Sequence, residues 1–148
     1  FENKMGFDFL AGTPSIVGDG NPPFRGVLLP TAGGAVVGVL NNLVTTKNRA
    51  VFVRDFITTQ NQLLDIASRI APVRHYNPVH AELDDLQGAA DDRLTQGLYD
   101  METFRPYIYR AMFDPAYRSE PLALDNQLLC ISEKSEANLE EAMRAVLG

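Results

Sequence analysis

The feature that most constrains this fold is an apolar run followed directly by the start signal of an amphipathic helix. Residues 50–55 (AVFVRD) open with four apolar positions rich in β-branched side chains, as expected of a strand buried in a parallel sheet. A helix is predicted over residues 57–70, because Thr59 and Gln62 have the spacing of a capping box and Pro72 ends the pattern. A strand joined to a helix by a short link is the building unit of an α/β sheet. The chain is therefore predicted to be α/β.

The preceding residues fit the same class. A short strand is expected around residues 15–17, closed by the Gly18-Asp19-Gly20-Asn21 turn, whose glycines supply positive φ angles. A helix is expected over residues 30–40, since Pro30 is tolerated in a first helical turn. That helix contains three glycines, each costing about 1 kcal/mol relative to alanine. A helix that keeps them is expected to pack closely on a flat surface such as a parallel sheet.

The second half of the chain is predicted to be helical. Residues 79–98 carry apolar side chains three and four positions apart among acidic ones, as an amphipathic helix does. Thr103 is a candidate N-cap of a further helix that Asp114-Pro115 ends, and Ser135 is a candidate N-cap of a last helix. A boundary between the sheet-like part and the helical part is expected near residues 72–78.

The charge balance argues against two classes of partner. The chain has 13 basic and 19 acidic residues and a net charge of −6, whereas non-specific binding to nucleic acid or to an anionic membrane needs a positive surface. No apolar run approaches the roughly 20 residues that span a bilayer, and the first residues do not resemble a signal peptide. A single cysteine gives no sign of an oxidising compartment. A cytoplasmic location is expected, with neither nucleic acid nor membrane as a partner.

Two groups of glycines are candidates for a nucleotide-binding turn. Such a turn joins a strand to a helix, so that backbone N–H groups and the helix N-terminus face the phosphates. The Gly18-Asp19-Gly20 group is followed by Pro22-Pro23 instead of a helix, and Gly33-Gly34 lies inside the expected helix. Turn formation and close packing explain both groups better, so no cofactor-binding residue is predicted in this chain.

The chain also has few candidates for catalysis or metal binding. Cys130 lies in an apolar run, where a cysteine is expected to be buried with an inert thiol. His75, His80 and one cysteine do not make a zinc pattern. His80 and Asp84 have a spacing that would suit an acid/base or metal pair, but a solvated helix start explains it equally well. No catalytic residue and no metal ligand is predicted.

Aromatic residues gather within twenty positions of the second half. Such a cluster lines a pocket for a flat apolar substrate in some proteins, and more often belongs to the core. Phe104 and Tyr107 are the predicted substrate-binding residues. The cluster consists of Tyr99, Phe104, Tyr107, Tyr109, Phe113 and Tyr117.

Several short stretches, taken in order, carry a family resemblance. They are GFD (6–8), DGN (19–21), AVVGVL (35–40), KNR (47–49), TTQNQL (58–63) and DNQLL (125–129). The chain thereby resembles the C-terminal half of the NmrA-like, isoflavone-reductase-like branch of the short-chain dehydrogenase superfamily. The resemblance covers residues 6–70 and 125–147 and is looser between them.

The resemblance implies an extended Rossmann enzyme. Its N-terminal half would bind NADP(H) through a glycine motif, and its smaller C-terminal lobe would cover the substrate. Members reduce small carbonyl or enone compounds, often phenolic, and others are non-catalytic regulators that sense the nucleotide. The glycine motif and the catalytic lysine or tyrosine belong to the N-terminal half, so no residue here inherits them. The chain departs from the family at Thr31-Ala32-Gly33, where members have an acidic residue followed by Ile-Gly.

The expectation for this chain is then a partial Rossmann-type sheet, its last strands, with a mostly helical C-terminal substrate lobe. Residues 1–72 would be the C-terminal part of the sheet with two helices, and residues 73–148 the helical segment of the substrate lobe. The chain does not begin with methionine, which fits a partial chain. The whole protein would be an NAD(P)-dependent oxidoreductase acting on a small organic substrate, with NADP bound by residues absent here and the isolated chain inactive. Two alternatives stay open: a non-catalytic regulator that binds a protein partner, and a self-sufficient small domain that binds a ligand or partner.

Overall fold

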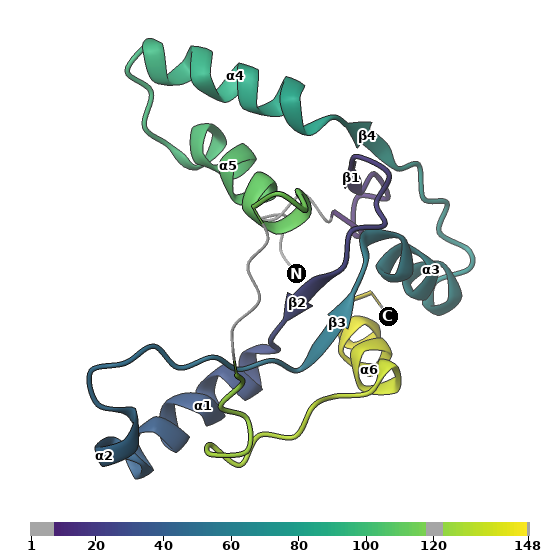
Figure 1. The fold of residues 1–148 in the computed structure, drawn as a ribbon. Helices are drawn as coiled ribbons and strands as arrows, with labels where there is room; N and C mark the ends of the chain where they lie inside the picture. Colours follow the sequence, from purple (N-terminus) through teal and green to yellow (C-terminus); the bar gives the residue numbers. More distant parts are fainter. Residues whose placement is uncertain (1–7, 118–122, 148) are drawn as a thin grey trace.

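The protein is a mixed α/β structure in which helices predominate (Figure 1). The structure, a computed structural model, describes residues 8–117 and 123–147. The predicted α/β class is confirmed. In chain order the elements are β1 (Ser15–Val17), β2 (Phe24–Gly26), α1 (Leu29–Asn41), α2 (Leu43–Thr46), β3 (Phe56–Thr58), α3 (Gln60–Ile70), β4 (Val79–Ala81), α4 (Leu83–Thr95), α5 (Met101–Phe113) and α6 (Glu136–Leu147).

The strands of the described residues form two small sheets of two strands each. β1 pairs in parallel with β4, with Ile16 opposite His80, and the N–H of Gly18 extends this ladder to the carbonyl of Ala81. β2 pairs antiparallel with β3, with Arg25 opposite Ile57. The expected strand at residues 15–17 is therefore confirmed as β1, and the Gly18–Asn21 turn after it has positive φ at Gly18 and Gly20.

The strand predicted over residues 50–55 is wrong. These residues have no regular secondary structure, and strand β3 begins only at Phe56. Phe52 keeps 47% of its surface exposed, so the apolar run is not buried between strands. A strand is defined by its ladder, and here the N–H groups of Phe52 and Arg54 bond to the side chains of Asp125 and Asn126 instead of to a neighbouring strand.

Two predicted helix caps are confirmed, although residues 57 and 58 belong to β3 and not to the helix expected over residues 57–70. At α3, the Thr59 hydroxyl accepts from the Gln62 N–H at 3.1 Å, and the Gln62 side chain accepts from the Thr59 N–H at 2.9 Å. At α6, the Ser135 N–H donates to the side-chain oxygen of Asn138 at 3.1 Å, and the Ser135 hydroxyl accepts in return. Both arrangements satisfy N–H groups that a helix start otherwise leaves without partners.

The start of α5 differs from the prediction. Asp100, not Thr103, is its N-cap, because the Asp100 carboxylate accepts from the Thr103 N–H at 2.9 Å. Aspartate is as good an N-cap as threonine, and it comes three residues earlier. Thr103 is buried within the first turn, and Pro106 lies inside the helix. The helix expected over residues 79–98 is also shorter, since Val79 to Ala81 form β4.

The core forms where α3, α6 and α5 meet the first strands. Helices α3 and α6 pack on each other, and α4 and α5 form a second packed pair. The rings of Phe24 and Phe113 meet edge to face, with centroids 5.6 Å apart. Residues from both sides of the expected boundary near 72–78 contribute to this one cluster. Its buried members are Phe9, Val17, Phe24, Leu63, Ile66, Ala67, Tyr109, Phe113, Leu139, Met143 and Leu147.

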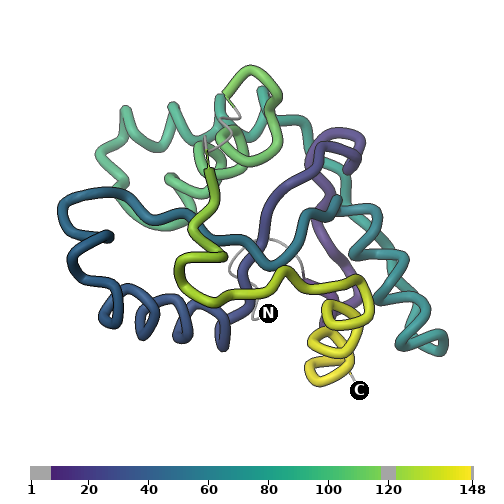
Figure 2. The backbone as a smooth tube through the Cα atoms, turned by 60° about the horizontal axis from the view of Figure 1, so that its bottom comes forward, coloured from purple at the N-terminus to yellow at the C-terminus, as the bar shows by residue number. Residues whose placement is uncertain are grey.

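Helices α1 and α2 stand outside that core, at the opposite end of the molecule from the α4–α5 pair (Figures 1 and 2). Gly38 is the buried residue of α1, and a Cβ there would lie only 2.9 Å from the Cβ of Leu129. Close packing is thus confirmed at Gly38, although against the turn that holds Leu129 and not against a sheet, and a Cβ at Gly33 or Gly34 would meet nothing within 4 Å. The apolar side chains that α1 and α2 leave exposed form what we call the α1 face: Leu29, Val36, Val37, Leu40, Leu43 and Val44.

Candidate functional site

A hollow of about 590 Å³ lies between the start of α1, the segment at residues 130–134 and the outer side of α6. Its volume would hold a small organic molecule. Its lining combines an amine, a thiol, hydroxyls, an amide and a carboxylate with apolar side chains. Its polar lining residues are Thr31, Cys130, Ser132, Lys134, Asn138 and Glu141.

A second hollow of about 250 Å³ adjoins β3 and the starts of α3 and α6. Lys134 lines both hollows, so they share one wall. The Lys134 side chain makes no ion pair with any residue in the described ranges, which leaves its amino group available to a ligand. The polar lining of this second hollow is Asp55, Thr58, Gln62, Glu133, Lys134 and Glu136.

Asp55 is the buried acid of this region, with 0% of its surface exposed. One carboxylate oxygen accepts from the Leu28 N–H at 2.7 Å, just before α1 begins. Its backbone N–H donates to the Gly26 carbonyl, and its carbonyl accepts from the Lys134 N–H at 2.6 Å. Asp55 therefore joins β2, the start of α1 and the segment that carries Lys134.

The second carboxylate oxygen of Asp55, Oδ1, has no hydrogen-bond partner among the described residues. A buried acceptor without a partner is costly, by roughly 1–3 kcal/mol, and most buried polar atoms have one. Oδ1 is thus a buried acceptor with an unused hydrogen-bonding position.

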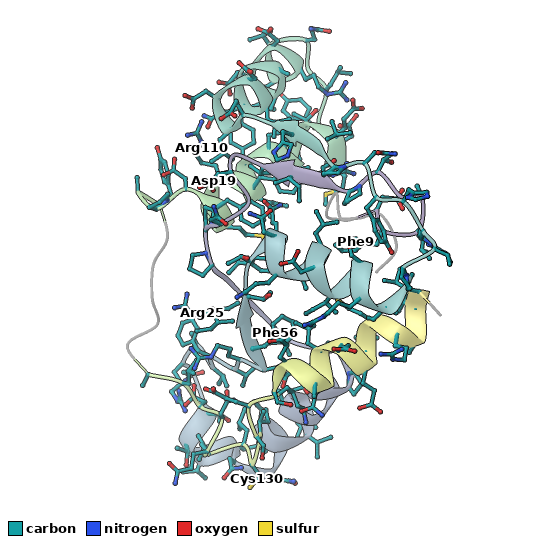
Figure 3. All side chains as sticks on the ribbon, turned by 90° about the vertical axis from the view of Figure 1, so that its right-hand side faces the viewer. Phe9, Asp19, Arg25, Phe56, Arg110 and Cys130 are labelled. Carbon is teal, nitrogen blue, oxygen red and sulfur yellow. The ribbon has the colours of Figure 1, made fainter. Side chains whose placement is uncertain are left out.

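Cys130 is exposed, so the prediction of a buried thiol is wrong. The surrounding run does not form a strand: residues 127–130 are a turn, and Cys130 itself has a positive φ of 57°. Leu129 takes the buried position instead, against Gly38. Figure 3 shows Cys130 at the end of the molecule opposite Arg110, beside α1.

The predicted substrate-binding residues lie elsewhere, on α5. Phe104 keeps 41% of its surface exposed, and Tyr107 is half-buried against α4. The Tyr107 hydroxyl donates to the Asp91 carboxylate, and this hydrogen bond to a negative group raises the pKa of Tyr107. Neither side chain lines the two hollows, so the structure does not bring them together with Asp55 and Lys134. Their assignment to a substrate stays a prediction.

The other aromatic residues divide between core and surface. Tyr109 and Phe113 are buried in the core cluster, whereas Tyr99 and Tyr117 are exposed. Burial raises the pKa of the Tyr109 hydroxyl. The cluster seen in the sequence is therefore not one pocket wall.

The histidine and acid spacing noted in the sequence has a structural role. The His80 Nδ1 lies 3.3 Å from the Gly18 carbonyl, next to the β1–β4 ladder. Asp84 accepts from Arg110, which also binds Asp114 and Gln87 and so ties α4 to α5. Within the part of the chain that the structure describes, no three histidine, cysteine or acidic side chains gather as metal ligands would.

Sequence reasoning gave no role to Asp55 or Lys134. The available signal was a carboxylate placed directly after an apolar run and before a helix cap, where a charge needs a nearby donor. That donor, the Leu28 N–H, lies 27 residues away in the chain, so only the fold reveals it.

Comparison with known proteins gives one kind of relative. The chain is 39% identical over 66 residues to "Oxidoreductase poxI" of Penicillium oxalicum, and the same protein from strain 114-2 matches equally well. The match covers 45% of this chain and 21% of the relative, so most of the relative has no counterpart in it. No family model matches the chain, and no solved structure matches it significantly. Within the described ranges, every helix is too short or too polar to cross a membrane.

Proposed function

We propose that this chain is part of an oxidoreductase. The observation that carries the proposal is the 39% identity over 66 residues to a fungal oxidoreductase. The finer proposal is an NAD(P)-dependent enzyme of the NmrA-like, isoflavone-reductase-like type, to which this chain contributes the substrate lobe. Its substrate would be a small organic compound with a carbonyl, enone or phenolic group.

Neither of the two glycine groups fits a nucleotide phosphate site. The Gly18–Asn21 turn leads from β1 to β2 and not into a helix, and the Asp19 carboxylate accepts from the Asn21 N–H, which lowers the pKa of Asp19. Gly33 and Gly34 lie inside α1. NADP is therefore proposed to bind residues outside this chain, where it would supply the hydride, and no step is assigned to it here.

Two places in the chain are candidates for the substrate. The first is the pair of hollows joined at Lys134, where the Lys134 amine would donate to a carbonyl oxygen of the substrate. The second is the exposed part of α5 with Phe104 and Tyr107. The first fits a small polar substrate better, because amine, hydroxyl, amide and carboxylate groups line it. Residues 1–72 and 73–148 remain the proposed division into sheet part and substrate lobe.

Binding and turnover test the proposal separately. The chain alone is expected to show no NADPH binding by fluorescence and no NADPH oxidation. Micromolar binding of NADPH to the chain alone would overturn the assignment of the cofactor to other residues. The longer protein read from the same coding sequence is expected to oxidise NADPH with a small aldehyde, enone or phenolic ketone. A longer protein that binds NADPH but reduces none of them would favour the regulator.

The substrate position is tested by NMR on the labelled chain titrated with the same small compounds. We expect shifts at Ser132 and Lys134, and their loss in Lys134→Met. Lys47→Met is the matched control, because Lys47 is exposed and lines neither hollow. Shifts confined to Phe104 and Tyr107 would move the substrate site to α5.

A further inference from the structure

Residues 51–54 are bonded along one edge as a strand is. The Phe52 N–H donates to the Asp125 carboxylate at 2.9 Å, and the Phe52 carbonyl accepts from the Asp125 N–H at 2.7 Å. Two residues on, the Arg54 N–H donates to the Asn126 side-chain oxygen at 3.0 Å, and the Arg54 carbonyl accepts from the Asn126 amide at 2.6 Å. Alternate residues that bond through both backbone groups mark an extended segment with one edge occupied. Asp125 and Asn126 take the place of a neighbouring strand.

The opposite edge of this segment is open. Among the described residues, the N–H and carbonyl groups of Val51 and Val53 have no hydrogen-bond partner. Val51 and Val53 are the residues whose backbone groups point away from Asp125 and Asn126, because successive residues of an extended chain alternate. An apolar, β-branched edge with free donors and acceptors is a template for another strand.

The occupied edge is held in place by an ion pair. Arg49 donates to both carboxylate oxygens of Asp125, at 3.1 and 2.8 Å. This pairing with Arg49 lowers the pKa of Asp125. A bidentate arginine fixes geometry as well as charge, so the open edge is presented in one orientation.

The uncovered α1 face belongs to the same part of the molecule. α1 packs on the segment after Asn126, since Gly38 abuts Leu129 and the Asn42 side chain donates to the Leu128 carbonyl at 3.4 Å. Residues 29–46 contain no charged side chain, and Val44 keeps 94% of its surface exposed. The tubes of α1 and residues 50–55 run on either side of the segment at residues 125–131 (Figure 2). An open strand edge and a bare apolar helix therefore occur together.

We infer that the Val51–Val53 edge is completed by a β-strand from polypeptide of the same protein outside these 148 residues, and that the added unit also covers the α1 face. The inference rests on the proposed function, in which this chain is part of a longer oxidoreductase. Its occupant is chosen because about four fifths of the fungal relative lies outside the match. One added sheet would account for the open edge and for the exposed helix, since one of its strands would pair with Val51–Val53 while its face would pack on the α1 face.

Amide hydrogen exchange measured by NMR tests the inference. In the chain alone, the amides of Phe52 and Arg54 are expected to exchange slowly and those of Val51 and Val53 quickly. In the longer protein read from the same coding sequence, Val51 and Val53 are expected to slow by roughly ten-fold or more, because a bonded amide exchanges only on local opening. Fast exchange at both valines in the longer protein, or a reading frame that adds no residues, would overturn the inference. Slow exchange that appears in the chain alone as its concentration rises would assign the edge to a second copy instead.

A pair of variants separates the two edges. Val53→Pro removes an open-edge N–H, so it is expected to leave unfolding of the chain alone nearly unchanged and to destabilise the longer protein. Phe52→Pro is the matched control, because it removes an N–H already bonded within the chain and should destabilise both. Equal effects of Val53→Pro on both proteins would contradict the inference. Amide exchange can be measured without NADPH. Slow exchange at Val51 and Val53 in a longer protein that oxidises no NADPH would therefore contradict the oxidoreductase proposal and support the added strand.

Discussion

Helices α1 and α3 differ in what their apolar residues meet. Of the 11 residues of α3, Leu63, Ile66 and Ala67 are buried against the core, and polar side chains cover the other side. The 13 residues of α1 carry no charge, yet the α1 face is exposed. An amphipathic helix needs one surface to pack on, whereas a helix that is apolar on most sides needs a second. The chain supplies that surface to α3 and only part of it to α1.

The energetic meaning of this difference is direct. Full burial of a valine or leucine side chain is worth roughly 1.5–3 kcal/mol. α3 gains this from α6 and the core cluster, but the side chains of the α1 face stay more than half exposed and gain little. The following substitutions test the contrast, beginning with the largest expected loss of stability.

The largest effect is expected from Ile66→Ala in α3. Ile66 is 2% exposed within the core cluster, and truncation of such a side chain costs about 2–5 kcal/mol in the free energy of unfolding. Val37→Ala on the α1 face is the matched control and should change it by less than about 0.5 kcal/mol. Urea unfolding of both variants measures the contrast. Similar losses from the two would show that α1 is packed as well as α3.

A smaller loss is expected where α1 is tied to β3. Asp55→Ala leaves the part-buried Leu28 N–H without its acceptor, at a cost of about 1–3 kcal/mol in the free energy of unfolding. Asp55→Asn keeps an oxygen at that position and should recover part of the loss. If thermal unfolding shows asparagine to be as damaging as alanine, the bond to Leu28 is not the cause.

The two helix starts give the third contrast. Thr59→Ala removes the capping box of α3 and should cost about 1 kcal/mol. Thr31→Ala in the first turn of α1 should cost nothing measurable, because α1 has no side-chain cap. Circular dichroism during urea unfolding reports both. A loss at Thr31 equal to that at Thr59 would remove this difference between the helices.

The smallest effect is expected in the stability of the fold at acid pH. The Asp100 carboxylate caps α5, and its bonds to the Thr103 N–H and to Arg93 lower its pKa from 3.8 to about 2. A group whose pKa is lower in the folded state stabilises the fold above its unfolded pKa, so this contribution is full above pH 4 and is lost as the pH falls toward 2. Asp100→Asn should flatten stability in that window, and the uncharged Thr59 cap of α3 should show no such dependence. If the free energy of unfolding of Asp100→Asn falls with pH in this window as it does in the unsubstituted protein, the Asp100 carboxylate is not the cause.

Local signals in the sequence predicted the elements that depend on neighbouring residues. The Thr59–Gln62 capping box, the Ser135 cap and the Gly18–Asn21 turn each satisfy their backbone groups within four residues, so their spacing alone was informative. Thr103 misled because Asp100, three residues earlier, caps the helix, and the Thr103 N–H and hydroxyl both donate to its carboxylate. The candidate site could not be predicted in the same way, since the hydrogen bonds of Asp55 to Leu28 and to Lys134 join distant parts of the chain.

The chain's residue order settled which stretches become helices, where α3 and α6 begin, and that the class is α/β, because those outcomes depend on short-range hydrogen bonds and on apolar periodicity. Only the folded structure decided that residues 50–55 stay out of a ladder, that Cys130 faces outward and that Asp55 is buried beside Lys134. Each of these outcomes depends on a partner more than 25 residues away or on the lack of one. An apolar run indicates that a segment suits a buried strand, but the segment becomes one only where neighbouring strands are present to pair with it.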